Sequence, residues 1–276
     1  MLLPGLIYFI MFRYIPVGGL VIAFKDYNPF VGIWDSAWVG LKQFQKFFDT
    51  PDFLRLLRNT LGISILQLIL FFPMPIFLSL LMNEVRHNGY KRTVQTLVYI
   101  PHFVSWVIVA SLTYQLFNVT DGAINHVIKS LTGQTIDVLS NSSAFWGLIV
   151  GQDIWKETGY GTIIFLAALA GVDQEMYEAA KIDGAGRWKL IWHITLPGML
   201  PIILLMGAMN LTSILSAGFD QIYNLYSPMV YQSGDVLDTY VYRMGMISRQ
   251  YSFSTAVGLL RSVVGMRLVL TANGLA

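Results

Sequence analysis

The chain of 276 residues is 55% hydrophobic and only 12% charged, and its 18 Lys and Arg residues exceed its 16 Asp and Glu residues by a net charge of +2. Soluble domains carry about 25% charged residues, so half of that fraction is typical of a membrane protein. The small net charge, without a basic tract, argues against nucleic-acid binding, and the lack of cysteine excludes disulfides, thiol catalysis and cysteine metal sites. No basic segment precedes the first apolar residues, so we expect no signal peptide.

Six stretches are predicted to span a membrane, since a helix needs about 20 mostly apolar residues to cross a bilayer core about 30 Å thick. Three hold no formal charge and cover residues 61–82, 93–117 and 194–219. Three weaker ones are interrupted by charged residues and cover residues 2–24, 144–172 and 252–276. The sequence therefore predicts an all-α fold, a polytopic membrane bundle of about six transmembrane helices that forms one domain over residues 1–276.

The loop charges decide the orientation only in part. The short loop 83–92 holds three basic residues, which is typical of the cytoplasmic side, and residues 173–193 hold three more. Two predicted spans separate these loops, so both lie on the same side. The loop 25–58 would then be external although it carries five basic residues, but its length and its four aspartates weaken that objection.

A polar segment between the fourth and fifth predicted spans, the coupling loop (residues 173–197), carries the most specific pattern. It reads Glu178-Ala-Ala-Lys-Ile-Asp-Gly184 and, nine residues later, Ile194-Thr-Leu-Pro197. Residues 174–183 are mostly good helix formers, and Gly184 can end that helix in a left-handed conformation. Residues 187–193 can form a second short helix, and Pro197 suits the first turn of the following span.

This pattern resembles the EAA loop of permease subunits in bacterial ATP-binding-cassette (ABC) importers. The resemblance implies a cytoplasmic helix that docks into a groove on a separate ATPase subunit, and it places both chain termini in the cytoplasm of a multi-pass inner-membrane protein. Small alanines would allow close approach, and Glu178 would meet a basic residue of the partner. The residues implied in ATPase coupling are Glu178, Ala179, Ala180, Asp183, Gly184 and Ala185. An ordinary cytoplasmic loop with a surface helix is the alternative.

Further segments resemble the carbohydrate branch of these importers, and in particular the larger partner of a heterodimeric permease pair distantly similar to the maltose permease. They cover residues 12–16, 23–29, 83–86, 99–106, 218–223 and 238–243. The resemblance implies a second permease subunit, an ATPase dimer, an extracytoplasmic solute-binding protein and an oligosaccharide as partners. The chain has no G-x-x-x-x-G-K-[ST] phosphate loop, so ATP and Mg²⁺ would be bound by the ATPase. The alternatives are an importer of a non-sugar solute such as amino acids and an ATP-independent membrane protein.

Polar residues inside predicted spans are costly and are therefore candidates for substrate binding. In the fourth span, Asp153, Trp155 and Tyr160 combine groups that bind hydroxyls with flat apolar faces, and they fall on positions comparable to the N-x-W…Y stretch of maltose-type permeases. Lys156 and Glu157 depart from that family pattern, which has neutral residues there. A charge pair that only stabilises the bundle is the alternative.

The fifth span offers Asn210 and Ser213, of which Asn210 falls on a sugar-contact position of the family. Their alternative role is hydrogen bonding between helices. Arg261, near the middle of the last span, should face the bundle, a water-filled cavity or an acidic partner, and an acidic saccharide becomes attractive if it faces the cavity. The pair Gly147 and Gly151 forms a G-x-x-x-G motif that close helix packing explains.

A membrane-embedded enzyme is the main alternative from another class. The four histidines show no H-E-x-x-H or similar spacing, and no G-x-S-x-G nucleophile motif is present. We therefore expect a non-catalytic transport subunit without a metal site.

Overall fold

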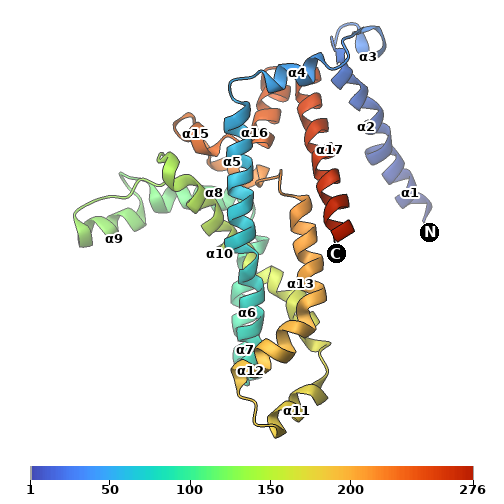
Figure 1. Cartoon of the computed structure of the whole chain (residues 1–276). Helices are drawn as coiled ribbons and strands as arrows, with labels where there is room; N and C mark the ends of the chain where they lie inside the picture. The colour runs from blue at the N-terminus through green and yellow to red at the C-terminus, as the bar shows by residue number, and fades with distance from the viewer. Residues whose placement is uncertain (1, 276) are drawn as a thin grey trace.

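The structure, a computed structural model, describes residues 2–275 and consists almost entirely of helices (Figure 1). One small antiparallel sheet pairs β1 (Lys25–Asp26) with β2 (Ala37–Trp38). Helix α11 (Gln174–Ile182) lies at one end of the bundle, and α3 (Gly32–Asp35) and α4 (Lys42–Phe48) lie at the opposite end (Figure 1). The prediction of an all-α helix bundle is confirmed.

Six helical segments correspond to the six predicted spans. The first comprises α1 (Leu3–Phe9), η1 (Ile10–Tyr14), α2 (Ile15–Gly18) and η2 (Gly19–Phe24). The second comprises α5 (Phe53–Leu66), η3 (Gln67–Phe71) and α6 (Pro73–Glu84), and the third α7 (Asn88–Tyr99), η4 (Ile100–Phe103) and α8 (Trp106–Phe117). The fourth is α10 (Ser142–Ala170), the fifth comprises α12 (Arg187–Leu190), η5 (Ile191–Thr195) and α13 (Leu196–Thr212), and the sixth is α17 (Tyr251–Leu275). Shorter helices connect the spans: α9 (Ala123–Thr132), α14 (Phe219–Leu225), η6 (Pro228–Val230), α15 (Tyr231–Gly234), α16 (Leu237–Tyr242) and η7 (Arg243–Ile247).

Length and composition support the membrane prediction. Three continuous stretches are long and apolar enough to cross a membrane: Leu3–Phe24, Phe53–Glu84 and Arg187–Thr212. The third segment reaches the same standard only when its two halves are counted together. With 29 residues, α10 is about 43 Å long at 1.5 Å per residue, which is enough to cross a bilayer. The sixth segment, α17, has 25 residues, and the last residue of its predicted span, 276, lies outside the described residues.

The third span, predicted over residues 93–117, is bent. Its two helical halves are bent by 98° relative to each other, because one helix ends at Phe103 and the next begins at Trp106. Between them Val104 is extended, and the Ser105 hydroxyl accepts a hydrogen bond from the Ile108 amide at 3.4 Å, which begins the new helix. Hydropathy alone does not indicate the bend, because the span stays mostly apolar through it, but Pro101 is a helix-breaking residue close to it.

The fifth span also departs from its predicted bounds of 194–219. It begins at Arg187, so the separate short helix expected over residues 187–193 is instead continuous with the span. It ends at Thr212, and an irregular segment follows until Gly218, which has φ +89°. Glycine adopts this left-handed conformation without steric cost, and the chain can therefore turn there into α14.

The fourth span, α10, is the helix against which much of the bundle packs, namely α6, α7, α13 and η3. Glycines allow the closest approaches. A Cβ atom at Gly159 would lie 1.9 Å from the Val98 carbonyl oxygen in α7, and one at Gly62 in α5 would lie 2.3 Å from the Trp146 ring in α10. These approaches fix which face of α10 is turned toward the second and third spans.

Candidate functional site

A cavity of 190 Å³, open on one side and lined by both polar and apolar side chains, lies between the second span, α10 and the irregular end of the fifth span, and we call it the polar cavity. Its polar side chains are Ser64, Gln67, Asp153, Asn210, Ser213 and Ser216. The lining thus combines a carboxylate, two amides and three hydroxyls. These groups form hydrogen bonds with hydroxyl-rich solutes, and a concave site with convergent polar groups is the usual form of a binding site.

Three of the predicted substrate residues meet in this cavity: Asp153, Asn210 and Ser213. Asp153 is only 8% exposed, and its Oδ2 accepts a hydrogen bond from Gln67 Nε2 at 2.5 Å. A buried carboxylate needs such a donor, because an unpaired charge away from water is costly. The amide nitrogen of Asn210 donates to the Met206 carbonyl of its own helix at 2.9 Å.

The other two candidates on α10 lie elsewhere. Trp155 follows Asp153 by two residues, which places it about 200° around the helix, and it lines an apolar groove of 440 Å³ between α8 and α10. Gly147 and Gly151 line the same groove, and a Cβ atom at either would meet no described atom within 4 Å. Their motif therefore does not pack against another helix of the part of the chain that the structure describes. Tyr160 stacks on the His102 ring, with centroids 3.8 Å apart and planes 3° from parallel.

Lys156 and Glu157 form an internal charge cluster with the bend of the third span. Lys156, 4% exposed, donates to Glu157 Oε1 at 2.7 Å and to the His102 carbonyl oxygen at 2.8 Å. The other Glu157 oxygen lies 2.6 Å from His102 Nδ1. Charges within a span are tolerated when they are paired in this way. The cluster therefore holds the bend at Val104 and Ser105 against α10.

Arg261 has an acidic partner, one of the three environments expected for it, although the sequence did not indicate which residue that would be. Its guanidinium forms an ion pair with Asp238 in α16, and Ser216 donates to the second oxygen of that carboxylate at 3.3 Å. Arg261 also lines a pocket of 420 Å³ together with Ser213 and Ser216, which line the polar cavity as well. The arginine is thus balanced in charge and stands beside the cavity.

The coupling loop has the local geometry that its sequence predicts. Asp173 caps α11 by accepting a hydrogen bond from the Glu175 amide at 2.9 Å. At the other end the Ala185 amide donates to the Ala180 carbonyl at 2.9 Å, and Gly184 has φ +79°. This is a Schellman ending, so the predicted helix and its left-handed glycine are confirmed.

The outer surface of α11 is open to a partner. Glu178, Ala179 and Asp183 are exposed, and Ile182 is 87% exposed. One contact ties this helix to the fifth span: the Tyr177 hydroxyl lies 3.0 Å from Thr195 Oγ1.

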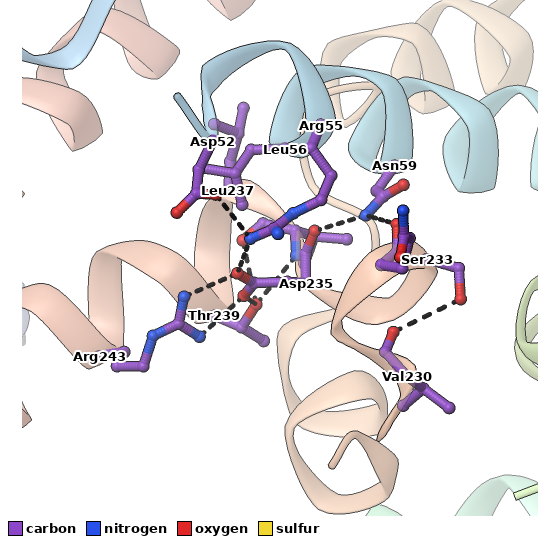
Figure 2. Close-up of polar contacts among 12 residues, drawn as sticks. Asp52, Arg55, Leu56, Asn59, Val230, Ser233, Asp235, Leu237, Thr239 and Arg243 are labelled. Atoms are coloured by element: carbon purple, nitrogen blue, oxygen red, sulfur yellow. Dashed lines mark hydrogen bonds and ion pairs between the residues drawn. The ribbon is translucent and has the colours of Figure 1, made fainter. Parts of the chain in front are cut away.

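Sequence reasoning also missed a polar cluster around Asp235, at the opposite end from α11 (Figure 2). The Asp235 side chain is fully buried, and Arg243 donates to its two oxygens at 2.9 and 2.6 Å. Thr239 donates to Asp235 at 3.0 Å, and Arg55 of α5 lies 3.5 Å away. Asn59, also in α5, donates to the Asp235 carbonyl at 3.0 Å. The cluster ties the second span to α15 and α16, and the hydrogen bonds that Arg243 donates to Asp235 raise the pKa of the Arg243 guanidinium above its ordinary value. Segment 238–243 carried a family resemblance, but nothing in it indicated this contact.

Within residues 2–275, no group of three or more His, Cys, Asp or Glu side chains could hold a metal ion. The candidate functional features of the described residues are the polar cavity, the buried charge clusters and the coupling loop.

Residues 71–272 match the family described as the binding-protein-dependent transport system inner membrane component. The chain belongs to this family. It is 53% identical over 276 residues to Protein LplB of Bacillus subtilis (strain 168), with 100% of this chain and 87% of that protein covered. It is 49% identical over 276 residues to the polygalacturonan/rhamnogalacturonan transport system permease protein YteP of the same strain, with 100% and 86% covered.

A solved structure resembles this permease over its whole length. It comes from a bacterial ABC transporter involved in the import of the acidic polysaccharide alginate. The TM-score is 0.93 at 39% sequence identity, and the match covers 100% of this chain and 93% of that chain. The protein is thus a multi-pass membrane permease of the ABC importers, and the family prediction made from the EAA pattern is confirmed.

Proposed function

We propose that this permease is one of two membrane subunits of an ATP-driven importer that moves an oligosaccharide from an extracytoplasmic binding protein into the cytoplasm. The polar cavity inside the bundle carries this proposal, because its hydroxyl, amide and carboxylate groups suit a solute covered with hydroxyls. The sugar undergoes no chemistry. Its passage depends on the difference in binding between the inward-open and outward-open states.

Asp153, Asn210 and Ser213 are the proposed sugar contacts of this chain. They come from the fourth and fifth spans, and the irregular segment after Thr212 lines the same cavity. Transporters commonly place their substrate at such interrupted helices, where unwound backbone is available for hydrogen bonding. Trp155 and Tyr160 are left out of this set because they line other surfaces.

The proposed substrate is an acidic saccharide. Two similar proteins are named for polygalacturonan/rhamnogalacturonan transport and for import of the acidic polysaccharide alginate. In this chain, Arg261 lines a pocket that shares Ser213 and Ser216 with the cavity. Asp238 already neutralises the charge of Arg261, so a sugar carboxylate would share Arg261 with Asp238 or displace Asp238 from it.

The coupling loop is proposed to transmit the energy of ATP binding and hydrolysis from the ATPase to this permease. Glu178, Ala179, Ala180 and Asp183, with the turn at Gly184 and Ala185, would dock on an ATPase dimer that binds ATP and Mg²⁺. This assignment places α11 and both chain termini in the cytoplasm of a bacterial inner-membrane complex. The exposed surface of α11 supports it, because the helix presents Ile182 and Glu178 away from the bundle.

Uptake into proteoliposomes tests which class of substrate the importer carries. The full complex, with its binding protein outside, should accumulate oligogalacturonides more than neutral oligosaccharides of equal length or amino acids. Arg261→Gln should lower uptake of the acidic sugar roughly ten- to hundredfold, since hydrogen bonds to charged groups contribute about 1.5–3 kcal/mol. Arg267→Gln, in the same helix, is the matched control. Equal uptake of acidic sugar by both variants would contradict the role of Arg261, and preferential uptake of amino acids would contradict the saccharide assignment.

A further inference from the structure

A group of five aromatic side chains, the aromatic run, begins where the polar cavity meets α14. Phe219, Tyr223 and Tyr226 are spaced i, i+4 and i+7, so they lie on one face of α14 and of the residue that ends it. Tyr231 of α15 and Tyr242 of α16 complete the run. Neighbouring ring centroids lie 4.9–6.0 Å apart, so the five rings are in continuous contact.

The other face of α14 is fixed inside the bundle. Gln221 is 2% exposed, and its Nε2 donates to the Ile149 carbonyl at 2.8 Å and to Gln152 Oε1 at 3.0 Å, both in α10. The Tyr114 hydroxyl of α8 donates to the Leu225 carbonyl at 3.1 Å. These contacts set the orientation of α14, and the aromatic run therefore stays on the face turned away from α8 and α10.

The aromatic run connects the polar cavity with the end of the bundle opposite α11. Gly218, which lines the cavity, directly precedes Phe219. At the other end of the run, the Arg243 guanidinium lies over the Tyr231 ring, 4.9 Å from its centroid. Arg243 belongs to the Asp235 cluster, which lies at the end opposite α11 (Figure 1). A solute that moves from that end toward the cavity would pass along these rings.

The aromatic run is accessible and has a polar border. Its central residue, Tyr223, is 37% exposed, and its other members are half-buried. Asp220, three residues before Tyr223 and hence its neighbour on the helix surface, is exposed. A carboxylate is costly in contact with lipid chains, so this face suits a ligand that arrives in water. Tyrosine offers such a ligand an apolar ring and a polar hydroxyl together.

We propose that the aromatic run is an entry subsite on which the sugar rings of an oligosaccharide stack before they reach the polar cavity. The apolar C–H face of a sugar ring packs on the Tyr223 ring, while the sugar hydroxyls at its edge stay in contact with water. The subsite is separate from the cavity contacts Asp153, Asn210 and Ser213. This inference rests on the proposed saccharide function and adds the approach to the cavity on its extracytoplasmic side.

Oligogalacturonide-stimulated ATP hydrolysis by the complete reconstituted complex tests whether the Tyr223 ring contacts the sugar. Tyr223→Leu keeps apolar bulk but loses the flat ring. The half-saturating sugar concentration should therefore rise roughly two- to tenfold, the usual effect of losing one aromatic contact. Tyr223→Phe keeps the ring and should raise it less. Tyr14→Leu, at an exposed tyrosine of the first span, is the matched control and should not raise it.

A single introduced thiol reports on occupancy directly, because the chain has no cysteine. The complex with its binding protein is treated with a membrane-impermeant thiol reagent, with and without oligogalacturonide. Labelling of Asp220→Cys should be several-fold slower with the sugar, and adding Tyr223→Leu should remove this protection. Gln134→Cys, at an exposed position of the loop before α10, is the control and should be labelled at the same rate in both conditions.

The outcomes separate this subsite from the proposed function. Equal labelling of Asp220→Cys with and without sugar, in a complex that the sugar stimulates, would overturn the subsite and leave the saccharide function standing. No labelling of Asp220→Cys in either condition would mean that the second permease or lipid covers the aromatic run, which also overturns the subsite. If no saccharide stimulates the wild-type complex, the saccharide function fails and the subsite fails with it.

Discussion

The hydroxyl of Tyr177 in α11 lies 3.0 Å from the hydroxyl of Thr195 in the fifth span. Thr195 belongs to a continuous helical stretch, Arg187–Thr212, whose far end reaches the polar cavity at Asn210. The coupling loop and the cavity are therefore joined by one continuous helical stretch, with Tyr177 as a side-chain tether at its base.

Removing the Tyr177 hydroxyl should loosen that tether. We expect Tyr177→Phe to retain ATP hydrolysis by the assembled complex and to lower sugar uptake per ATP several-fold, since one hydrogen bond contributes about 1 kcal/mol. Parallel uptake and hydrolysis assays on the same proteoliposomes give this ratio. Tyr90→Phe, at an exposed tyrosine of α7, is the control. An unchanged ratio in Tyr177→Phe would mean that the hydroxyl contact does not transmit motion.

The turn that ends α11 should be sensitive to any side chain at Gly184. Its φ of +79° costs an ordinary L-residue about 1–2 kcal/mol, so Gly184→Leu should distort the Schellman ending. We expect loss of sugar-stimulated ATP hydrolysis while the membrane fold persists. Gly186→Leu is the matched control, because Gly186 has φ −75° and a Cβ atom there would meet no described atom within 4 Å. Full stimulation in Gly184→Leu would contradict the docking role of the turn.

Neutralising Asp235 should destabilise the end of the bundle opposite α11. Asp235→Asn leaves Arg243 without its carboxylate partner, and breaking a buried pair costs about 3–5 kcal/mol. The arginine side chain is 20% exposed, so we expect the lower end of that range, about 3 kcal/mol. Thermal unfolding in detergent measures the loss against Asp220→Asn, at an exposed aspartate of α14. Equal melting temperatures would show that the Asp235 cluster does not stabilise the fold.

Close helix packing at Gly159 predicts a contrast between two glycines of α10. Gly159→Ala places a Cβ atom against the Val98 carbonyl, and overpacking usually costs about 1–3 kcal/mol. Gly151→Ala meets no described atom within 4 Å and should be neutral or stabilising, because alanine favours helices by about 1 kcal/mol. Unfolding of the purified chain measures both. The packing account is wrong if the two variants unfold alike.

Local signals explain what could be predicted. The six helical segments follow from apolar runs, and the ending of α11 follows from Gly184, whose conformation depends on its immediate neighbours. The irregular segment before Gly218 could not be found in this way, because apolar or small residues continue through it, whereas Pro101 is a helix-breaking residue close to the bend at Ser105.

The cavity was predicted only in part. Asp153 and Asn210 stood out as polar residues within spans, and helical periodicity alone could have separated Trp155 from Asp153. Gln67 carried no motif, since its hydrogen bond to Asp153 joins residues that lie 86 positions apart in the sequence. The same holds for Asp238, whose partner Arg261 is 23 residues away.

Sugar-stimulated ATP hydrolysis by the reconstituted complex, with Glu178→Lys compared with Glu175→Lys, tests the central claim most directly. The complex contains this permease, its second permease, the ATPase and the binding protein, and it is assayed with acidic and neutral oligosaccharides. We predict stimulation by an acidic oligosaccharide that Glu178→Lys abolishes and Glu175→Lys largely retains. Stimulation that survives Glu178→Lys, or a fully assembled complex that no saccharide stimulates, would contradict the account.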